Sequence, residues 1–341
     1  MKTNLPAKWI FAALAAALFA SCATTPRVAT EKSAPLVWPL PPDQPRIAYV
    51  RSLHNPRDIG QSLSFFTRIG HWLTGETGES LALQKPFGLA LDETGNLCIT
   101  DTGANLVCYL DFAHKKWRRY LAAGKTAFVS PVAVAKRNGI FYVADSALGE
   151  VLAFRDDGKS AFEITNSLVR PVGLAIDGNL LAVVDSQAHD VSVFDLAGKF
   201  LFKFGKRGTG PGEFNFPTHI ASDATGRWLV TDSLNCRIQI FSADGKFISQ
   251  FGSSGDTSGH FGRPKGVAED SFGHIYVADA IFDNVQIFDA SGQLLLNFGQ
   301  SGAGAGEFGL PNGVVIAPDN TIYIADAYNH RVQIFKYLGG Q

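Results

Sequence analysis

Short apolar segments separated by turn residues recur along most of this chain, and residues 311–335 show the pattern most clearly. The first segment begins at Pro311 and ends in a turn at residues 318–320. The second, residues 322–325, alternates aliphatic with other side chains, which is the period of a strand with two different faces. A second turn leads to a third segment, residues 331–335. The pattern predicts three short strands joined by tight turns.

The same pattern occurs six times along the chain. Each copy begins at a proline, and its second strand ends at an aspartate. The prolines are Pro86, Pro131, Pro171, Pro217, Pro264 and Pro311, and the aspartates are Asp101, Asp145, Asp185, Asp232, Asp279 and Asp326. Consecutive aspartates lie 44, 40, 47, 47 and 47 residues apart. In all six copies the next predicted strand begins six residues after the aspartate. A constant offset predicts one turn geometry used six times.

A fourth strand follows in most copies after a glycine-containing turn, as in residues 198–205, 245–252 and 292–299. Six copies of four short antiparallel strands, at intervals of about 45 residues, predict an all-β fold, a six-bladed β-propeller. The sixth copy lacks its fourth strand, whereas an unassigned strand at residues 46–53 precedes the first copy. We expect this N-terminal strand to complete the last blade.

The N-terminal residues are typical of an export signal. Lys2 and Lys8 provide positive charge, and residues 9–20 form an apolar segment too short to span a bilayer. We therefore interpret residues 1–21 as a signal peptide outside the fold.

Ala20 and Ser21, directly before Cys22, resemble the lipobox of bacterial lipoproteins. That resemblance implies an acylated Cys22, with palmitate among its chains, as the only membrane attachment. Because Ala23 follows, it also implies a cell-envelope location at the outer membrane, facing the periplasm or the cell surface. Residues 22–45 would form the Pro-rich tether. An ordinary signal peptide with a coincidental cysteine is the alternative.

The connection at residues 55–85 is longer than the others. Residues 61–73 show partial helical spacing of apolar positions. A short amphipathic helix there would either pack on the propeller rim or act as a lid or a partner-binding surface.

Overall composition gives little indication of a nucleic-acid partner. The chain has 341 residues and a net charge of −1, and only 18% of its residues are charged. We therefore expect no nucleic-acid binding.

The repeated motif, Pro-x-Gly-Val-Ala followed by Asn-x-Arg-Val-Gln-Ile-Phe, resembles the NHL repeat. The match is closest in residues 235–241 and 329–335 and extends over residues 46–338. The resemblance implies that binding takes place on the face that carries the loops before each proline and after each aspartate. It also admits enzymes, because some NHL-like propellers are metal-dependent lyases or hydrolases.

Several basic residues lie near these loops. The candidate ligand face comprises Lys85, Arg170, His219, Arg263, Lys265, Arg237 and Arg331. Lys85, Arg170, Arg263 and Lys265 flank the prolines without neighbouring acids, so they form either a positive funnel for an anion or scattered surface charge. We expect Arg237 and Arg331 to pair with nearby carboxylates.

The lyase resemblance places zinc-binding histidines on separate blades. Here only His189, His219 and His330 are available, so the sequence provides little support for a metal site. Cys98 and Cys108 lie symmetrically about Gly103, so we expect them to be cross-strand neighbours and, in an exported protein, to form a disulfide.

Together these features predict a monomeric, lipid-anchored, non-catalytic propeller without a cofactor, which presents its loop face to a protein partner or ligand in the cell envelope. A secreted metal-dependent lyase or lactone hydrolase on the same fold is one alternative. An envelope sensor of a small anionic ligand is another.

Overall fold

The computed structural model describes residues 35–61, 81–165 and 167–339. The chain divides into two units, residues 1–35 and residues 36–341, and the account below concerns the second. Its described residues form almost entirely antiparallel β-sheets. Five of these sheets contain four strands each and a sixth contains five, and we number the six as blades 1 to 6 in the order of their innermost strands.

The first three blades alternate short strands with tight turns. Blade 1 contains β3 (Pro86–Leu91), β4 (Leu97–Asp101), β5 (Leu106–Asp111) and β6 (Lys116–Tyr120). Blade 2 contains β9 (Pro131–Arg137), β10 (Ile140–Asp145), β11 (Glu150–Arg155) and β12 (Ser160–Ile164). Blade 3 contains β13 (Pro171–Asp177), β14 (Leu180–Asp185), β15 (Asp190–Asp195) and β16 (Phe200–Phe204).

The next three blades repeat the same order. Blade 4 contains β17 (Pro217–Ser222), β18 (Trp228–Asp232), β19 (Arg237–Phe241) and β20 (Phe247–Phe251). Blade 5 contains β21 (Pro264–Glu269), β22 (Ile275–Asp279), β23 (Asn284–Phe288) and β24 (Leu294–Phe298). Blade 6 contains β25 (Pro311–Ile316), β26 (Thr321–Asp326) and β27 (Arg331–Tyr337).

The six prolines each begin an innermost strand, and the six aspartates each end the second strand, as the sequence predicts. In every blade the proline is paired with the aspartate, and the register shifts next to this pair. Proline has no N–H to donate, so an irregular pair at the end of the ladder suits it. Neighbouring innermost strands contact one another in sequence, and β25 contacts β3 to close the ring.

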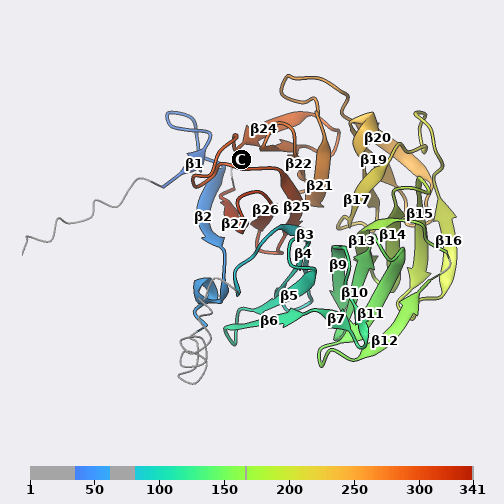
Figure 1. The fold of residues 1–341 in the computed structure, drawn as a ribbon. Helices are drawn as coiled ribbons and strands as arrows, with labels where there is room; N and C mark the ends of the chain where they lie inside the picture. The colour runs from blue at the N-terminus through green and yellow to red at the C-terminus, as the bar shows by residue number, and fades with distance from the viewer. Residues whose placement is uncertain (1–34, 62–80, 166, 340–341) are drawn as a thin grey trace, which may run out of the picture. The chain divides into compact units, whose positions relative to one another are not determined.

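The N-terminal strand completes blade 6. Strand β2 (Ile47–Leu53) pairs antiparallel with β27, and Figure 1 shows the two side by side. Its two ends, Ile47 and Leu53, are fully buried. The predicted strand at residues 46–53, and with it the closure of the ring, is confirmed.

Part of the predicted tether also belongs to this blade. Strand β1 (Val37–Trp38) pairs with β2 as a fifth strand. The Trp38 ring packs against Phe298 and Phe335, with both centroid separations at 5.8 Å. The folded unit therefore begins before residue 46, because a large aromatic side chain gains more from burial than from remaining in a solvated tether.

Aromatic pairs fill the spaces between blades. In blades 4, 5 and 6 a phenylalanine from the preceding loop packs on a phenylalanine of the third strand. These pairs are Phe214–Phe241, Phe261–Phe288 and Phe308–Phe335, with centroids 5.4, 5.5 and 5.8 Å apart. One packing unit thus recurs in the three blades whose sequences are most alike.

Other elements lie outside the repeat pattern. A 3₁₀ helix, η1 (Pro56–Ile59), follows β2, and a small hairpin of β7 (Ala122–Ala123) and β8 (Thr126–Ala127) links blades 1 and 2. The predicted signal peptide, Cys22 and nearly all of the predicted helix at 61–73 lie outside the described residues. Among the helices of the described part, none has the length and apolar character needed to cross a membrane.

Candidate functional site

The repeated aspartate joins two loops at one end of each blade, which we call the loop face. In blade 1 the Asp101 carboxylate accepts N–H bonds from Gln84 and Lys85, before the first strand, at 2.7 and 2.9 Å. It also accepts bonds from Gly103 and Ala104, in the following turn, at 3.0 and 3.1 Å. The residues before each proline and after each aspartate are therefore held together.

The same arrangement positions two arginines at the central opening. Asp185 Oδ1 accepts the backbone N–H of Arg170 at 3.1 Å, and Asp279 Oδ1 accepts that of Arg263 at 3.0 Å. Both arginines are exposed, and among the described residues neither is part of an ion pair. Their backbones are thus fixed while their charges face solvent.

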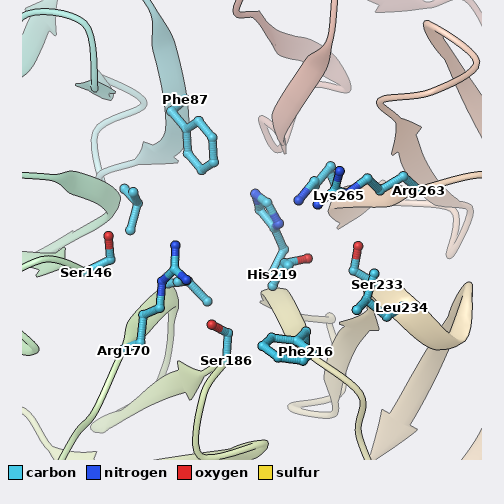
Figure 2. Close-up of a pocket in the computed structure, with 13 residues that line it drawn as sticks. Phe87, Ser146, Arg170, Ser186, Phe216, His219, Ser233, Leu234, Arg263 and Lys265 are labelled. Carbon is cyan, nitrogen blue, oxygen red and sulfur yellow. The ribbon is translucent and has the colours of Figure 1, made fainter.

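A cavity of about 370 Å³ opens at the centre of the loop face. The residues after five of the prolines line it, namely Phe87, Val132, Val172, Thr218 and Lys265. His219 of β17 and seven residues near the strand ends complete it: Ser146, Arg170, Ser186, Phe216, Ser233, Leu234 and Arg263. Figure 2 shows Arg170 and Lys265 extending toward the cavity from different blades. The lining therefore combines three cations with apolar walls and contains no carboxylate.

One position deeper, the innermost strands form a ring of small residues with a single exception. The ring consists of Gly88, Ala133, Gly173, His219, Gly266 and Gly313. A Cβ on Gly266 would lie 2.3 Å from the carbonyl oxygen of Asn312, so the backbones approach too closely for a side chain there. His219 is the one member of this ring with a side chain large enough to reach into the cavity. Sequence reasoning identified this residue for the same reason.

The His219 side chain contributes a polar but uncharged group to the cavity lining. Burial, reinforced by the charge of Lys265, lowers the pKa of His219 to about 3, and the nearby Asn312 amide only partly opposes this. Protein surrounds most of the imidazole, although water reaches part of it through the cavity. Its Nδ1 has no hydrogen-bond partner in the protein, nor do Thr218 Oγ1 and Asn312 Oδ1. At neutral pH the imidazole therefore carries no charge.

Lys265 is protonated at neutral pH, although its surroundings disfavour the charged amine. Burial and the charges of Arg263 and Arg170 lower the pKa of Lys265 to about 8. All three causes act against the protonated amine. An anion bound among the three cations would offset part of their mutual repulsion. Without a ligand, this repulsion is not neutralised by any carboxylate of the cavity lining.

Sequence reasoning did not identify the loop residues that complete the cavity. Ser146, Ser186 and Ser233 each follow a repeated aspartate, while Phe216 precedes a proline and Leu234 lies two residues after an aspartate. The signal was present, because all five occupy fixed offsets from the repeat landmarks. Only the three-dimensional ring brings these offsets to one opening.

Comparison with known families supports the repeat assignment. A model of the NHL repeat matches residues 308–335, and a model of a family described as "6-bladed beta-propeller" matches residues 168–227. The chain is an NHL-type six-bladed β-propeller. Solved structures share the propeller fold across most of its length.

A streptogramin B lyase aligns with a TM-score of 0.55 and 11% identity, over 74% of this chain and 94% of that chain. Virginiamycin B lyase from Staphylococcus aureus aligns with a TM-score of 0.55 and 15% identity, over 75% of this chain and 96% of that chain. A protein of unknown function from Bacteroides thetaiotaomicron aligns with a TM-score of 0.59 and 14% identity, over 75% of this chain and 70% of that chain. At these identities the likeness shows the fold alone.

Three residues of the predicted ligand face, Lys85, Arg237 and Arg331, do not line the cavity. Arg237 Nε is 2.8 Å from Asp232, and Arg331 Nε is 2.7 Å from Asp326, with all four side chains largely buried. The predicted pairing is therefore confirmed, and it removes both arginines from the ligand face. Lys85 is exposed on the loop face but is not part of the cavity lining.

His189 and His330 connect neighbouring blades instead of binding a metal with His219. Both have positive φ in the turn four residues after the aspartate, as do all six residues at that offset. His189 Nδ1 accepts the N–H of Phe216 at 3.1 Å, and His330 Nδ1 contacts the carbonyl of Gln84. No group of three metal-binding side chains occurs within the described ranges.

The expected disulfide between Cys98 and Cys108 is wrong. Cys98 is opposite Tyr109, and Cys108 is opposite Ile99, so the two cysteines are one residue out of register. A shift of one residue places side chains on opposite faces of a sheet. Accordingly Cys98 and Cys108 are buried in different core clusters, and both are free, as is Cys236.

Proposed function

We propose that this propeller is a lipid-anchored binding protein of the cell envelope that recognises an anionic group in its loop-face cavity. The observation that carries the proposal is the lining of that cavity: Arg170, Arg263 and Lys265 converge without a carboxylate. Such an arrangement attracts anions and repels cations. The apolar walls formed by Phe87 and Val172 supply additional contact for the ligand.

The site is preorganised for binding. The backbones of Arg170 and Arg263 are held by buried aspartates, so less flexibility is lost on binding. Arginine also offers paired donors that match the two oxygens of a carboxylate or phosphate. The lowered pKa of Lys265, to about 8, means that binding an anion relieves an existing repulsion.

The lipid anchor at Cys22 remains part of the proposal. It rests on the sequence around Cys22, where Ala20 and Ser21 precede the cysteine. A Cys22→Ser variant should move from the membrane fraction to the soluble fraction and lose metabolic labelling with palmitate. Unchanged fractionation of this variant would reject the anchor and leave the binding proposal intact.

A metal-dependent lyase is the second candidate, and His219 is the observation that favours it. The imidazole lies in the central cavity, and structural neighbours include a lyase crystallised as a catalytically inactive histidine-to-alanine variant with quinupristin. Against this, a pKa of about 3 makes His219 a poor proton acceptor at neutral pH. Metal that co-purifies with the protein and is lost in His219→Ala would favour the enzyme.

Binding of matched small probes tests the proposed function. Benzoate and benzamide have the same ring and differ in charge, so ligand-detected NMR with both isolates the electrostatic contribution. The proposal predicts saturable binding of benzoate that competes with phosphate, and much weaker binding of benzamide. Equal binding of the two probes would reject an anion site.

A further inference from the structure

We infer that the natural occupant of the loop face is a polypeptide: a protein segment that inserts a carboxylate into the cavity and lays apolar side chains across blades 4 to 6. This inference rests on the proposed anion site and names the partner of that site. It derives from an uneven distribution of exposed apolar side chains on the loop face.

Two positions in each blade surround the cavity mouth: the residue before the proline and the second residue after the aspartate. In blades 1 to 3 these are Lys85, Gly103, Ser130, Ala147, Arg170 and Gln187. In blades 4 to 6 they are Phe216, Leu234, Arg263, Ile281, Leu310 and Tyr328. Five of the second six are large and apolar, and none of the first six is.

These five side chains are exposed. Tyr328 is 68% exposed and Ile281 is 58% exposed, and Phe216, Leu234 and Leu310 are also exposed. We call these five residues the apolar arc. Val129 and Val169 are also exposed, two residues before the prolines of blades 2 and 3, but both side chains are smaller than those of the apolar arc.

Hydrogen bonds between loops fix the backbone that carries the apolar arc. The N–H of Leu234 bonds to the carbonyl of Asn215, next to Phe216, and the N–H of Tyr328 bonds to that of Gly309, next to Leu310. Between blades 5 and 6, Asp283 accepts the N–H of Leu310 at 2.7 Å. The backbone under the apolar arc is thus held by hydrogen bonds, which position its side chains relative to one another.

The apolar arc adjoins the cations of the cavity. Phe216 and Leu234 line the cavity together with Arg170, Arg263 and Lys265, as Figure 2 shows. A small anion bound in the cavity would leave Ile281, Leu310 and Tyr328, which lie outside its lining, in water. A polypeptide with an acidic residue or a terminal carboxylate would use both features. Exposed apolar patches mark interaction sites, and aromatic residues and arginine are enriched in protein interfaces.

Site-specific photo-cross-linking in cells that express the full chain tests this inference. p-Benzoylphenylalanine is placed at Ile281 or Tyr328, the two residues of the apolar arc that are most exposed and do not line the cavity. The matched controls are Phe247 and Leu295, which are exposed on the outer strands of blades 4 and 5. Benzoate binding by each purified variant verifies that the cavity is intact.

The inference predicts that both arc positions cross-link to the same protein and that the control positions do not. Mass spectrometry should locate the cross-link on a segment that combines a carboxylate with apolar side chains. Adding Arg170→Gln and Lys265→Met should reduce the cross-linked product about fivefold or more, because the segment loses its charge partners.

Three results would overturn the inference. One is intact benzoate binding without any cross-link specific to the apolar arc, which would leave the cavity to a small ligand. The second is equal cross-linking at the control positions. The third is cross-linking to a second copy of this chain. If the unmodified protein did not bind benzoate, the proposed function itself would be rejected.

Discussion

The rings of Phe87 and His219 face one another in the loop-face cavity, with centroids 6.2 Å apart and planes inclined by 25°. The two residues come from blades 1 and 4, so this contact spans the ring of blades. It narrows the central opening above the ring of small residues, where only about 40 Å³ of space remains. The floor of the cavity is therefore aromatic and neutral, and the charge lies around its mouth.

The neutral state of His219 predicts a specific loss of stability in acid. Its pKa is about 3 in the folded protein against 6.5 as the usual value, so below pH 6.5 the unfolded chain binds a proton that the folded chain does not. Between pH 6.5 and 4.5 this group should lower the free energy of unfolding by about 1–2 kcal/mol, after allowance for water in the cavity. Urea unfolding of wild type and His219→Gln at both pH values measures the difference. An identical pH dependence of the two proteins would contradict the neutral imidazole.

Lys265 should lower the free energy of unfolding of the ligand-free protein at neutral pH. The folded state loses the Lys265 proton near pH 8, whereas the unfolded chain keeps it to about 10.5. The free energy of unfolding should therefore rise with pH across this window, because the unfolded state binds more protons there. Lys265→Met should be more stable than wild type by about 1–3 kcal/mol at pH 7 and should lose this rise.

Chemical denaturation of wild type and Lys265→Met at pH 7 and pH 9.5 measures both effects. A stabilised variant that no longer binds benzoate would show that the lysine serves binding at the expense of stability. A variant less stable than wild type at pH 7 would show that Lys265 has a structural role.

Arg331 should be far more important for stability than the residue at its position in blade 5. Its guanidinium pairs with buried Asp326 and donates to the carbonyls of Gly304 and Glu307 at 2.6 and 2.9 Å. Arg331→Met leaves a buried carboxylate without its cation and should cost about 3–5 kcal/mol.

Asn284 supplies the matched control. It occupies the equivalent position, five residues after Asp279, and its Oδ1 has no hydrogen-bond partner. Asn284→Leu should change the free energy of unfolding by less than about 1 kcal/mol, because no satisfied hydrogen bond of that oxygen is lost. Similar costs for the two substitutions, measured by urea unfolding, would contradict the role assigned to Arg331.

Closure of the ring should depend on β2. A chain that begins at Leu36 keeps β1 and β2, whereas one that begins at His54 loses the fully buried side chains of Ile47 and Leu53. The shorter chain should lose at least about 4 kcal/mol of stability, from two buried aliphatic side chains and one strand ladder. Matching denaturation curves for the two chains would show that β27 needs no outer partner.

Repetition explains how much of this structure could be predicted from sequence. The fixed offsets between proline, aspartate and third strand determined the blades, and the missing strand of the last copy pointed to β2. Strand β1 was missed because Val37 and Trp38 form a two-residue strand among prolines, where no period can be read. A single copy of a feature carries little pattern information, even when its packing is decisive.

The prediction of the site failed in part for a geometric reason. The cysteine pairing placed the turn centre at Gly103, whereas Asp101 pairs with Leu106 and the centre lies half a residue later. That half residue shifts the cross-strand pairing by one residue, so Cys98 and Cys108 lie on opposite faces of the sheet. The convergence of Arg170 with Lys265, and the contrast between the two halves of the loop face, depend on how six blades close into a ring. Neither is encoded in any one repeat.

The central claim is that the three cations of the loop-face cavity bind an anion, and a calorimetric titration of benzoate tests it most directly. The titration compares wild type with an Arg170→Gln, Arg263→Gln, Lys265→Met triple variant, at pH 7 and constant ionic strength. The account predicts saturable binding to wild type, with an affinity at least about tenfold higher than that of the variant. Equal affinity of the two proteins for benzoate would contradict it.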